Sequence, residues 1–408
     1  MRILLRQTRH NRFTLPLLAN LVETWDKGKR AYLGVARGLE EALAALEGDS
    51  PVLLAYSFMT PQLGEVSDEV RQIRQHLRPR DLLVAGGPHP TADPEGTLAL
   101  GFQAVVVGEG EEVFPRLLDG WAGKGCPEGA PPLWRGSSVC NLDAALPLSL
   151  RLNWMAPVEI SRGCPHLCGY CFTPRIHPPP VRHRGMESIR RYLWESRRMG
   201  RTVARFIAPD ASAYRDPGSG GSPWESLRVL LRTCRDAGMS RVHLGSFPSE
   251  VRPEGVREEF LELILNYCSN RTLVIGAQSG SDRVLRALRR GHTVAHAVEA
   301  VRRVVSAGLI AHVDMIFGVP SETLEDRLES LRLMERLIGL GRTKIHAHIY
   351  LPLPATPLFH LSPAPLEPWF LDLLSAMQDS GSLDGEWEGQ LLVQERILRW
   401  RRLGMIRV

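Results

Sequence analysis

Residues 159–172 read EISRGCPHLCGYCF and carry Cys164, Cys168 and Cys171 in the spacing C-x3-C-x2-C. Three thiolates on one short loop can ligate three irons of a [4Fe–4S] cluster, which leaves the fourth iron to bind a substrate or cofactor. A structural zinc site is the alternative, and it would need a fourth ligand such as His166 or His177. A disulfide would leave one thiol unpaired and is the weakest interpretation, because the chain shows no export signal.

The bulk composition is typical of a two-domain globular protein. The chain has 408 residues, and 44% of them are hydrophobic, which is enough for two cores. No apolar run approaches about 20 residues, so no membrane span is expected. Residues 1–6 (MRILLR) are too short in their apolar part for a signal peptide and read as a strand, so a cytoplasmic location is expected. The net charge of +5 is modest for this length, and nucleic acid is not expected as a partner.

The first 125 residues alternate short apolar runs with helical patterns, which predicts a doubly wound, Rossmann-like parallel sheet. After this domain (1–125) we expect a linker over 126–155, which is rich in Pro and places Cys126 and Cys140 in loops as free thiols. The expected strands are 2–5, 52–57, 82–85 and 104–107, and the expected helices are 34–46, 65–77 and 111–120.

A second strand–helix series predicts a partial (β/α)6 barrel of the TIM type over 156–360, so the fold class is α/β throughout. Such barrels carry their chemistry at the C-terminal ends of the strands, and the cysteine loop directly follows the first strand. Residues 361–408 are expected to form a small helical extension. The expected strands are 157–161, 203–208, 241–245, 272–276, 310–317 and 344–350, and the expected helices include 186–198, 223–237, 294–307 and 323–338.

The barrel sequence resembles the radical S-adenosylmethionine (SAM) enzymes, in the branch with methylthiotransferases and cobalamin-dependent members. The cysteine run is similar to the family signature, and GAQSGSD (276–282), DMIFGVPSET (314–323) and YLPLPATP (350–357) are similar to its strand-end segments. The resemblance implies that the three cysteines hold a [4Fe–4S] cluster whose open iron binds SAM. Asp210 has an alternative role as a helix N-cap or turn residue. The implied SAM-binding residues are Tyr170, Phe172, Asp210, Ser246, Gln278, Ser279, Ile316 and Gly318.

Three N-terminal segments resemble the cobalamin-binding class of this family: YSFMT (56–60), AGGPHPT (85–91) and VGEGEE (107–112). Each follows a predicted strand, at the edge where open α/β sheets bind ligands. The common motif Asp-x-His-x-x-Gly is absent, because QTRHNR (7–12) occupies its place. Bound cobalamin without a protein imidazole is the favoured interpretation; His10 as lower ligand, or a domain that has lost the cofactor, are alternatives. The implied cobalamin-binding residues are Ser57, Met59, Thr60, Gly86, Gly87, Pro88, His89, Gly108 and Glu109.

These resemblances imply a cobalamin-dependent radical SAM enzyme, with C-methylation as the expected reaction. A small-molecule or peptide substrate and an external electron donor of flavodoxin or ferredoxin type are the expected partners. A rearrangement or cyclisation, methylthiolation, and a non-catalytic zinc- or corrinoid-binding module remain alternatives. One further pattern concerns the barrel interior: His346, His348 and Tyr350 share one strand face, as do His312 and Asp314. They are expected to meet substrate there or to be buried core side chains.

Overall fold

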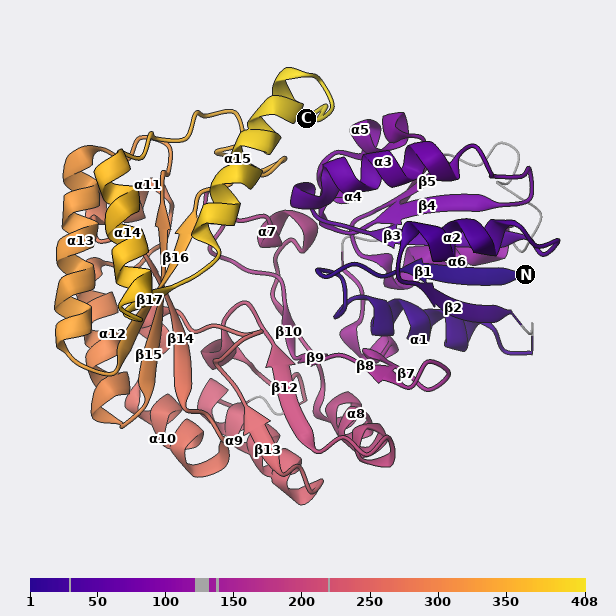
Figure 1. Ribbon diagram of the computed structural model, residues 1–408. Helices are drawn as coiled ribbons and strands as arrows, with labels where there is room; N and C mark the ends of the chain where they lie inside the picture. Colours follow the sequence, from indigo (N-terminus) through magenta and orange to yellow (C-terminus); the bar gives the residue numbers. More distant parts are fainter. Residues whose placement is uncertain (29–30, 122–131, 137–138, 219–220) are drawn as a thin grey trace. The chain divides into compact units, whose positions relative to one another are not determined.

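The computed structural model describes residues 1–28, 31–121, 132–136, 139–218 and 221–408. Two compact units divide the chain (Figure 1). Unit 1 consists of Met1–Pro157, Arg175–Pro178 and Arg399–Val408, and unit 2 consists of Val158–Pro174 and Pro179–Leu398. Cys126 lies outside the described residues, and Cys140 lies in a loop, as predicted, with its side chain buried and outside any disulfide.

Unit 1 is built on a fully parallel sheet in the order β2-β1-β3-β4-β5-β6. The order reverses between β1 and β3, and at such a switch point doubly wound sheets bind their ligands. The predicted Rossmann-like class is confirmed. The strands are β1 (Arg2–Arg6), β2 (Tyr32–Ala36), β3 (Val52–Ser57), β4 (Leu82–Gly86), β5 (Ala104–Val107) and β6 (Leu133–Arg135).

Alternate residues of these strands pack against helices on one face of the sheet, as the period of two requires. Ile3, Leu5, Leu53 and Ala55 form this core with the apolar side chains of α1 and α6, including Trp121. The helices of unit 1 are α1 (Leu15–Trp25), α2 (Leu39–Leu46), α3 (Leu63–Ile73), α4 (Pro88–Ala92), α5 (Pro94–Leu100) and α6 (Gly110–Trp121).

One predicted helix was placed wrongly. The pattern predicted a helix over 34–46, but residues 32–36 form the edge strand β2, and α2 begins only at Leu39. Gly34 and Val35 are poor helix formers, and pairing with β1 satisfies their backbone groups. Strand pairing with β1 therefore overrides the helical pattern at residues 34–36, and the Leu- and Ala-rich run that follows forms α2.

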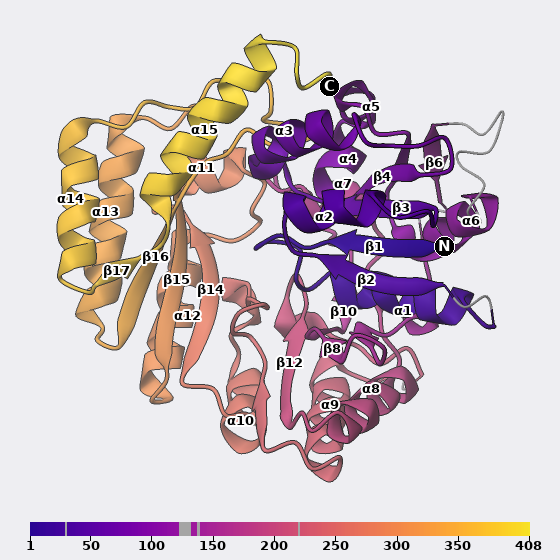
Figure 2. The ribbon, with the colours of Figure 1, turned by 45° about the vertical axis from the view of Figure 1, so that its right-hand side comes forward.

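Unit 2 is a partial barrel of parallel strands with helices outside them (Figure 2). Its two sheets have the orders β13-β12-β9 and β14-β15-β16-β17, and the Val274 N–H joins them by donating to the Gly245 carbonyl at 2.9 Å. The strands are β9 (Val158–Glu159), β12 (Val203–Ile207), β13 (Arg241–His243), β14 (Thr272–Gln278), β15 (Ile310–Phe317), β16 (Thr343–Ile349) and β17 (Leu383–Asp384).

The helices of unit 2 form where amphipathic runs follow each strand, and side-chain caps fix several of their starts. Thr323 and Asp326 form a capping box at the start of α13, and Asp326 also accepts from the Ser281 hydroxyl at 2.7 Å. This carboxylate therefore ties the loop after β14 to α13. The helices wholly within unit 2 are α8 (Met186–Arg198), α9 (Pro223–Asp236), α10 (Glu258–Tyr267), α11 (Asp282–Ala287), α12 (Val294–Ser306), α13 (Leu324–Gly339) and α14 (Pro368–Asp379). Two more, α7 (Thr173–Ile176) and α15 (Trp387–Arg402), begin in unit 2 and end in residues assigned to unit 1.

Two short antiparallel pairs complete the elements that matter for the site. They are β7 (Leu148–Ser149) with β8 (Trp154–Met155), and β10 (Ser161–Arg162) with β11 (Arg182–His183).

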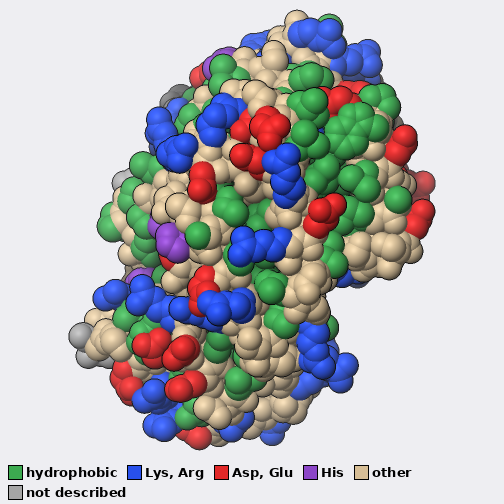
Figure 3. Space-filling view, turned by 90° about the vertical axis from the view of Figure 1, so that its left-hand side faces the viewer, with side chains coloured by type: hydrophobic (Ala, Val, Ile, Leu, Met, Phe, Trp, Pro, Cys, Tyr) green, Lys and Arg blue, Asp and Glu red, His purple; other side chains and the backbone are tan. Residues whose placement is uncertain are grey.

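Basic, acidic and apolar side chains are interspersed on the face that Figure 3 shows. Among the described helices, none combines the length and apolar character needed to cross a membrane.

Candidate functional site

The cysteine loop begins where β10 ends, at the C-terminal side of the first barrel strand. Gly163 has a φ of +89°, which suits glycine at this turn. The loop is tied to the barrel by the Gly169 N–H, which donates to the Leu288 carbonyl at 2.9 Å. The side chains of the three cysteines Cys164, Cys168 and Cys171 line one cavity of about 330 Å³.

A buried arginine faces this trio. Arg290 directs Nη1 toward the Cys168 sulfur at 3.7 Å and toward the Tyr170 hydroxyl at 3.0 Å, and its Nη2 donates to the Gly276 carbonyl at 2.6 Å. Burial raises the pKa of the Cys164 and Cys171 thiols. Metal ligation requires thiolates, and a fixed guanidinium stabilises the negative charge that they bring. Three sulfurs on one cavity wall, with a cation beside them, fit a thiolate-ligated cluster.

The two histidines considered as a fourth zinc ligand lie apart from this wall. His166 lines a second cavity of about 220 Å³, which shares Cys164 with the first. His177 belongs to unit 1, where its Nδ1 is hydrogen-bonded to Glu109 at 2.9 Å. Neither histidine is among the described residues that line the cavity shared by all three cysteines.

Two carboxyl groups lie on the same cavity as the cysteines. Glu250 follows β13, Asp314 is on β15, and the two side chains share a hydrogen bond. Burial and the neighbouring Asp314 together raise the pKa of Glu250 to about 7, and the charge of Arg290 opposes the shift. Glu250 is therefore partly protonated near neutral pH.

Several residues implied by the family resemblance line this cavity. Tyr170, Gln278 and Ile316 do so together with the cysteines. Gln278 follows a β-bulge at the end of β14 and has a φ of +74°, a strained conformation for a residue other than glycine. Strain at a strand end is typical of a residue whose side chain must be aimed at a ligand.

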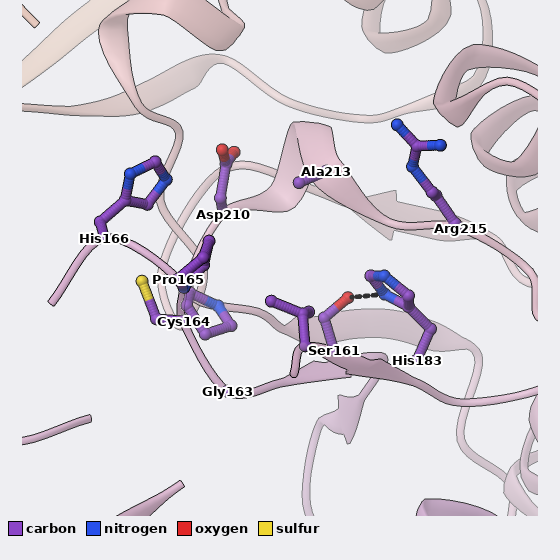
Figure 4. A pocket seen from close by; sticks show the side chains of 11 residues that line it. Ser161, Gly163, Cys164, Pro165, His166, His183, Asp210, Ala213 and Arg215 are labelled. Atoms are coloured by element: carbon purple, nitrogen blue, oxygen red, sulfur yellow. Dashed lines mark hydrogen bonds between the residues drawn. The ribbon is translucent and has the colours of Figure 1, made fainter. Parts of the chain in front are cut away.

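Asp210 lies on the second cavity, beside Cys164 and His166 (Figure 4). Its carboxylate also caps the short 3-10 turn Ala211–Ala213, because Oδ1 accepts from the Ser212 N–H at 3.0 Å and from the Ser212 hydroxyl at 2.7 Å. The capping alternative is therefore present in the structure, and the residue also borders a cavity. Burial raises the pKa of this carboxyl group.

Four other residues are placed differently. Ser279 is buried against Ser330, the Gly318 N–H donates to Glu322 at 2.8 Å, and the Ser246 hydroxyl is buried without a hydrogen-bond partner. These three and Phe172 are not among the described residues that line either cavity.

The sequence did not single out three charged residues of the cavity. Glu250 and Arg252 stand in the loop after β13, and Arg290 follows α11. The rule that barrel sites form at C-terminal strand ends would have pointed to the first two. Nothing in the sequence distinguishes Arg290 from its neighbour Arg289, because only the fold buries one and exposes the other.

In unit 1, the residues of the predicted cobalamin site come together at the C-terminal ends of β3, β4 and β5. The Phe58 N–H donates to the Gly86 carbonyl at 3.3 Å, and the Gly108 N–H donates to the Thr91 hydroxyl at 3.0 Å. Gly87 has a φ of +95°, and a Cβ atom there would lie 2.7 Å from the Ser57 hydroxyl oxygen. This edge therefore presents glycine backbone and small side chains. The residues at this edge include Ser57, Met59, Thr60, Gly86, Gly87, Pro88, His89, Gly108 and Glu109.

His89 is fully buried at this edge. Its Nδ1 is hydrogen-bonded to the Thr60 hydroxyl at 3.1 Å, its ring lies 5.3 Å from that of Phe58, and its Nε2 is buried without a partner. Burial lowers the pKa of His89 to about 4, so the ring is neutral at pH 7. An unpartnered buried nitrogen beside a glycine turn fits a site for an uncharged polar group of a ligand.

Glu109 and the first loop have other contacts. The Glu109 carboxylate accepts a hydrogen bond from the Cys140 N–H at 3.0 Å and is hydrogen-bonded to His177. The Asn11 amide donates to the carbonyls of Arg6 and Ser57, which joins the first loop to β3. His10, the possible lower ligand, is exposed.

Comparison with known proteins accounts for both units. Residues 158–334 match the family model of the radical SAM superfamily, and residues 13–118 match that of the B12 binding domain. The chain therefore contains a radical SAM domain. A B12 binding domain precedes it along the sequence.

Two curated relatives illustrate the sequence similarity. The uncharacterized protein MK0932 of Methanopyrus kandleri is 26% identical over 353 residues, which cover 72% of this chain and 65% of that protein. A tRNA-2-methylthio-N(6)-dimethylallyladenosine synthase of Thermus thermophilus is 30% identical over 218 residues, which cover 52% of this chain and 44% of that protein. The chain thus spans less than two thirds of the length of either relative.

Two solved structures share the fold of both units. The radical SAM methyltransferase TsrM from Kitasatospora setae, with cobalamin and a [4Fe–4S] cluster bound, has a TM-score of 0.65 and 16% identity over 88% of this chain and 77% of that one. The cobalamin-dependent SAM radical enzyme OxsB, with aqua-cobalamin bound, has a TM-score of 0.62 and 15% identity over 82% of this chain and 52% of that one. At these identities the likeness concerns the fold.

Proposed function

We propose that this chain is a cobalamin-dependent radical SAM methyltransferase that methylates a carbon atom of a small molecule or peptide. The observation that carries the proposal is the single cavity lined by Cys164, Cys168 and Cys171, in a chain that also has a B12 binding domain. Residues 156–360 hold the cluster and SAM, residues 1–125 hold cobalamin, and residues 361–408 form a helical C-terminal extension. When bound, the cluster supplies the electron that cleaves SAM, and cobalamin carries the methyl group.

The side chains around the cysteines match the charges of SAM. Arg252 and Arg290 offer guanidinium groups for its carboxylate, and the Glu250–Asp314 pair offers one negative charge for its ammonium. The Gln278 side-chain amide would hydrogen-bond the ribose hydroxyls of SAM. Ile349, Leu351 and Leu353 supply apolar wall on the same cavity and keep water from the reacting carbon.

In unit 1, glycine and small side chains allow the nucleotide tail of cobalamin to approach the backbone. Gly108 leaves open space beside the sheet edge, and Gly87 allows Ser57 and Phe58 to pack closely against its backbone. His89 adds a buried Nε2 without a hydrogen-bond partner at the same edge. The first loop would offer cobalamin no imidazole at the usual motif position, because QTRHNR (7–12) stands where Asp-x-His-x-x-Gly is expected and the Asn11 amide donates to the Arg6 and Ser57 carbonyls. His10 is the alternative ligand.

The neighbours support a small substrate. A TsrM structure with tryptophan and the SAM analogue aza-SAM bound has a TM-score of 0.64 and 15% identity with this chain. A reducing, cytoplasmic setting and an electron donor of flavodoxin or ferredoxin type belong to the same proposal, because oxidation would destroy the cluster.

The test is anaerobic purification with cobalamin supplied, followed by turnover with SAM and a reductant. Retained corrinoid, about four irons per chain, and formation of both 5′-deoxyadenosine and S-adenosylhomocysteine are expected. Deoxyadenosine without S-adenosylhomocysteine would replace methyl transfer by a rearrangement. A protein that binds no corrinoid would remove the cobalamin part, and zinc in place of iron would overturn the whole proposal.

Methylthiolation is a second candidate, because the barrel is similar to that of tRNA methylthiotransferases. It finds no support in the first domain, since residues 1–125 contain no cysteine for a second cluster. Incubation with tRNA and SAM, followed by nucleoside analysis for a methylthio group, separates the two functions.

A further inference from the structure

The inner face of the barrel sheet carries a polar cluster that the proposed reaction does not use. His312 on β15, His346 on β16 and Asp384 on β17 each offer one ligand atom, and these atoms lie within 4.8 Å of one another. The strand register explains the cluster, because His346 pairs with Asp384 and the neighbouring Asp314 pairs with His346.

This face belongs to the same strands whose Asp314, Ile316 and His348 line the cysteine cavity. The interior of a (β/α) barrel is normally packed with branched apolar side chains. Here Ala311, Val313 and Ile345, which point outward to the helices, are fully buried. His312 and His346 point the other way, and their side chains are 25% and 32% exposed. The inner face is therefore open to small solutes where a packed core is expected.

The contacts already approach those of a metal site. His312 Nε2 lies 3.0 Å from Asp384 Oδ2, and His346 Nδ1 lies 2.5 Å from Asp384 Oδ1. Ligands about 2.0–2.2 Å from a tetrahedral Zn²⁺ ion lie about 3.3 Å apart, so small side-chain movements would accommodate the ion. Two imidazoles and one carboxylate form a set that binds Zn²⁺ and similar divalent ions.

We propose that His312, His346 and Asp384 form a binding site for a divalent transition metal ion, Zn²⁺ by preference, separate from the cysteine loop. The ion clamps the two-residue strand β17 onto β15 and β16. Asp314 supports the site from outside, because one of its oxygens lies within 4.8 Å of a ring nitrogen of His346, and metal-bound imidazoles commonly donate their other N–H to a carboxylate.

His348 is excluded from the ligand set by its hydrogen bonds. The Ile349 N–H donates to Gln390 Oε1 at 2.7 Å, which turns the Gln390 amide nitrogen toward His348 Nδ1 at 3.3 Å. His348 Nε2 faces Asp314 Oδ1 at 3.7 Å. Both ring nitrogens of His348 thus face groups other than Asp384, and we leave His348 out of the ligand set.

Lys344 is the competitor of the metal. Its Nζ lies 3.3 Å from Asp384 Oδ2, the oxygen that also contacts His312. Without an ion, Asp384 is satisfied by the ammonium and two imidazole N–H groups, so the cluster would be a purely structural ion pair. The two interpretations differ in the zinc affinity that they predict once Lys344 is removed. A metal site loses a competing cation and binds Zn²⁺ more tightly, whereas an ion pair only loses a partner and its affinity for Zn²⁺ does not rise.

The experiment uses the full chain with its iron–sulfur cluster reconstituted anaerobically. The protein is equilibrated with micromolar ZnCl2, desalted, and analysed for zinc and iron by mass spectrometry. We expect one zinc per chain that leaves the iron content unchanged, and a loss of zinc affinity of more than about tenfold in H346A and D384N. H360A, which removes an exposed histidine, is the matched control and should keep the zinc.

K344M adds a readout that a structural cluster would not move, and its zinc affinity should rise. Wild type without zinc, H346A and D384N with undiminished zinc, or K344M with unchanged or weaker affinity would overturn the proposal. Circular dichroism and iron content identify any variant that fails to fold; H312A then replaces it in the comparison. None of these outcomes depends on SAM or cobalamin, so failure here leaves the proposed function standing.

Discussion

The barrel and the sheet of unit 1 each carry candidate ligand-binding residues at the C-terminal ends of their strands, and these two regions differ in charge. In the barrel, Glu250, Asp314 and Arg290 surround the cysteine loop, and the pKa of Glu250 is raised to about 7 by burial. In unit 1, the corresponding edge is formed by glycines, a neutral His89 and Glu109, whose carboxylate is hydrogen-bonded to the Cys140 N–H and to His177. Ionic surroundings suit a zwitterionic cofactor such as SAM, and a glycine-lined edge with its carboxylate already bonded suits close contact with a large, rigid one.

The largest effect of a substitution is expected at the cysteine loop, where it tests the ionic site of this comparison. C168A should lower the iron content and reduce SAM cleavage by more than about 100-fold, because a cluster ligand is lost. Iron and sulfide analysis and deoxyadenosine formation measure it. C268A, outside the loop, is the control and should keep the cluster. Undiminished SAM cleavage by C168A would contradict the cluster assignment.

Gly87 tests the opposite edge. G87A should destabilise unit 1 by about 1–3 kcal/mol or more, since a φ of +95° with a ψ of −165° is a conformation essentially reserved for glycine. The new Cβ would also clash with Ser57. Corrinoid retention should fall while deoxyadenosine formation is kept, which separates the two sites.

Gly28 provides a matched control for this variant. It also has a positive φ, of +80°, but a Cβ there would meet nothing within 4 Å. G28A should therefore show only the backbone cost in thermal or denaturant unfolding. Equal losses of corrinoid in G28A and G87A would show that strain alone, and not the glycine edge, explains the effect.

Glu250 offers a smaller effect, visible as a pH dependence. The folded protein keeps this proton up to a pKa of about 7, whereas the ordinary value is 4.5. Folding is therefore favoured while Glu250 is protonated, and the free energy of unfolding should fall as pH rises from about 4.5 to about 7. E250Q removes the group, so the difference between wild type and E250Q should change over this window. E258Q, at an exposed position, should show no such change.

The sequence alone predicted most of the strands of the two sheets and the three cysteines of the candidate site. Each strand of the two sheets that carries a motif was expected, and strand 310–317 has the predicted bounds, because buried parallel strands are short apolar runs with clear limits. The edge strand β2 was missed because Gly34–Ala36 also fits the start of an amphipathic helix. Only the pairing with β1 decides between the two.

The charged residues of the cavity show the other limit. Cys164, Cys168 and Cys171 are recognisable because their spacing within one loop is itself the ligand geometry. Arg290 and Asp384 come from segments far along the chain, and their partners follow from barrel closure. The pattern of residues placed His312 and Asp314 on one face of their strand, and His346 and His348 on one face of theirs, but it could not supply Asp384 on the third strand that completes the cluster.

An effect of the same size as that of Glu250, but of opposite sign with pH, belongs to His89 and sharpens the contrast in charge. Burial lowers its pKa to about 4 from an ordinary 6.5, so the unfolded chain takes up a proton more readily than the folded one. Stability should therefore fall as pH drops from about 6.5 to about 4, by at most about 1.4 kcal/mol per pH unit. H89N keeps a polar group near Thr60 and removes the titration; H76N, at an exposed histidine, is the control. If wild type and H89N lose stability in parallel over this window, the ring is not held neutral by burial, and the neutral state assigned to His89 at the glycine edge is wrong.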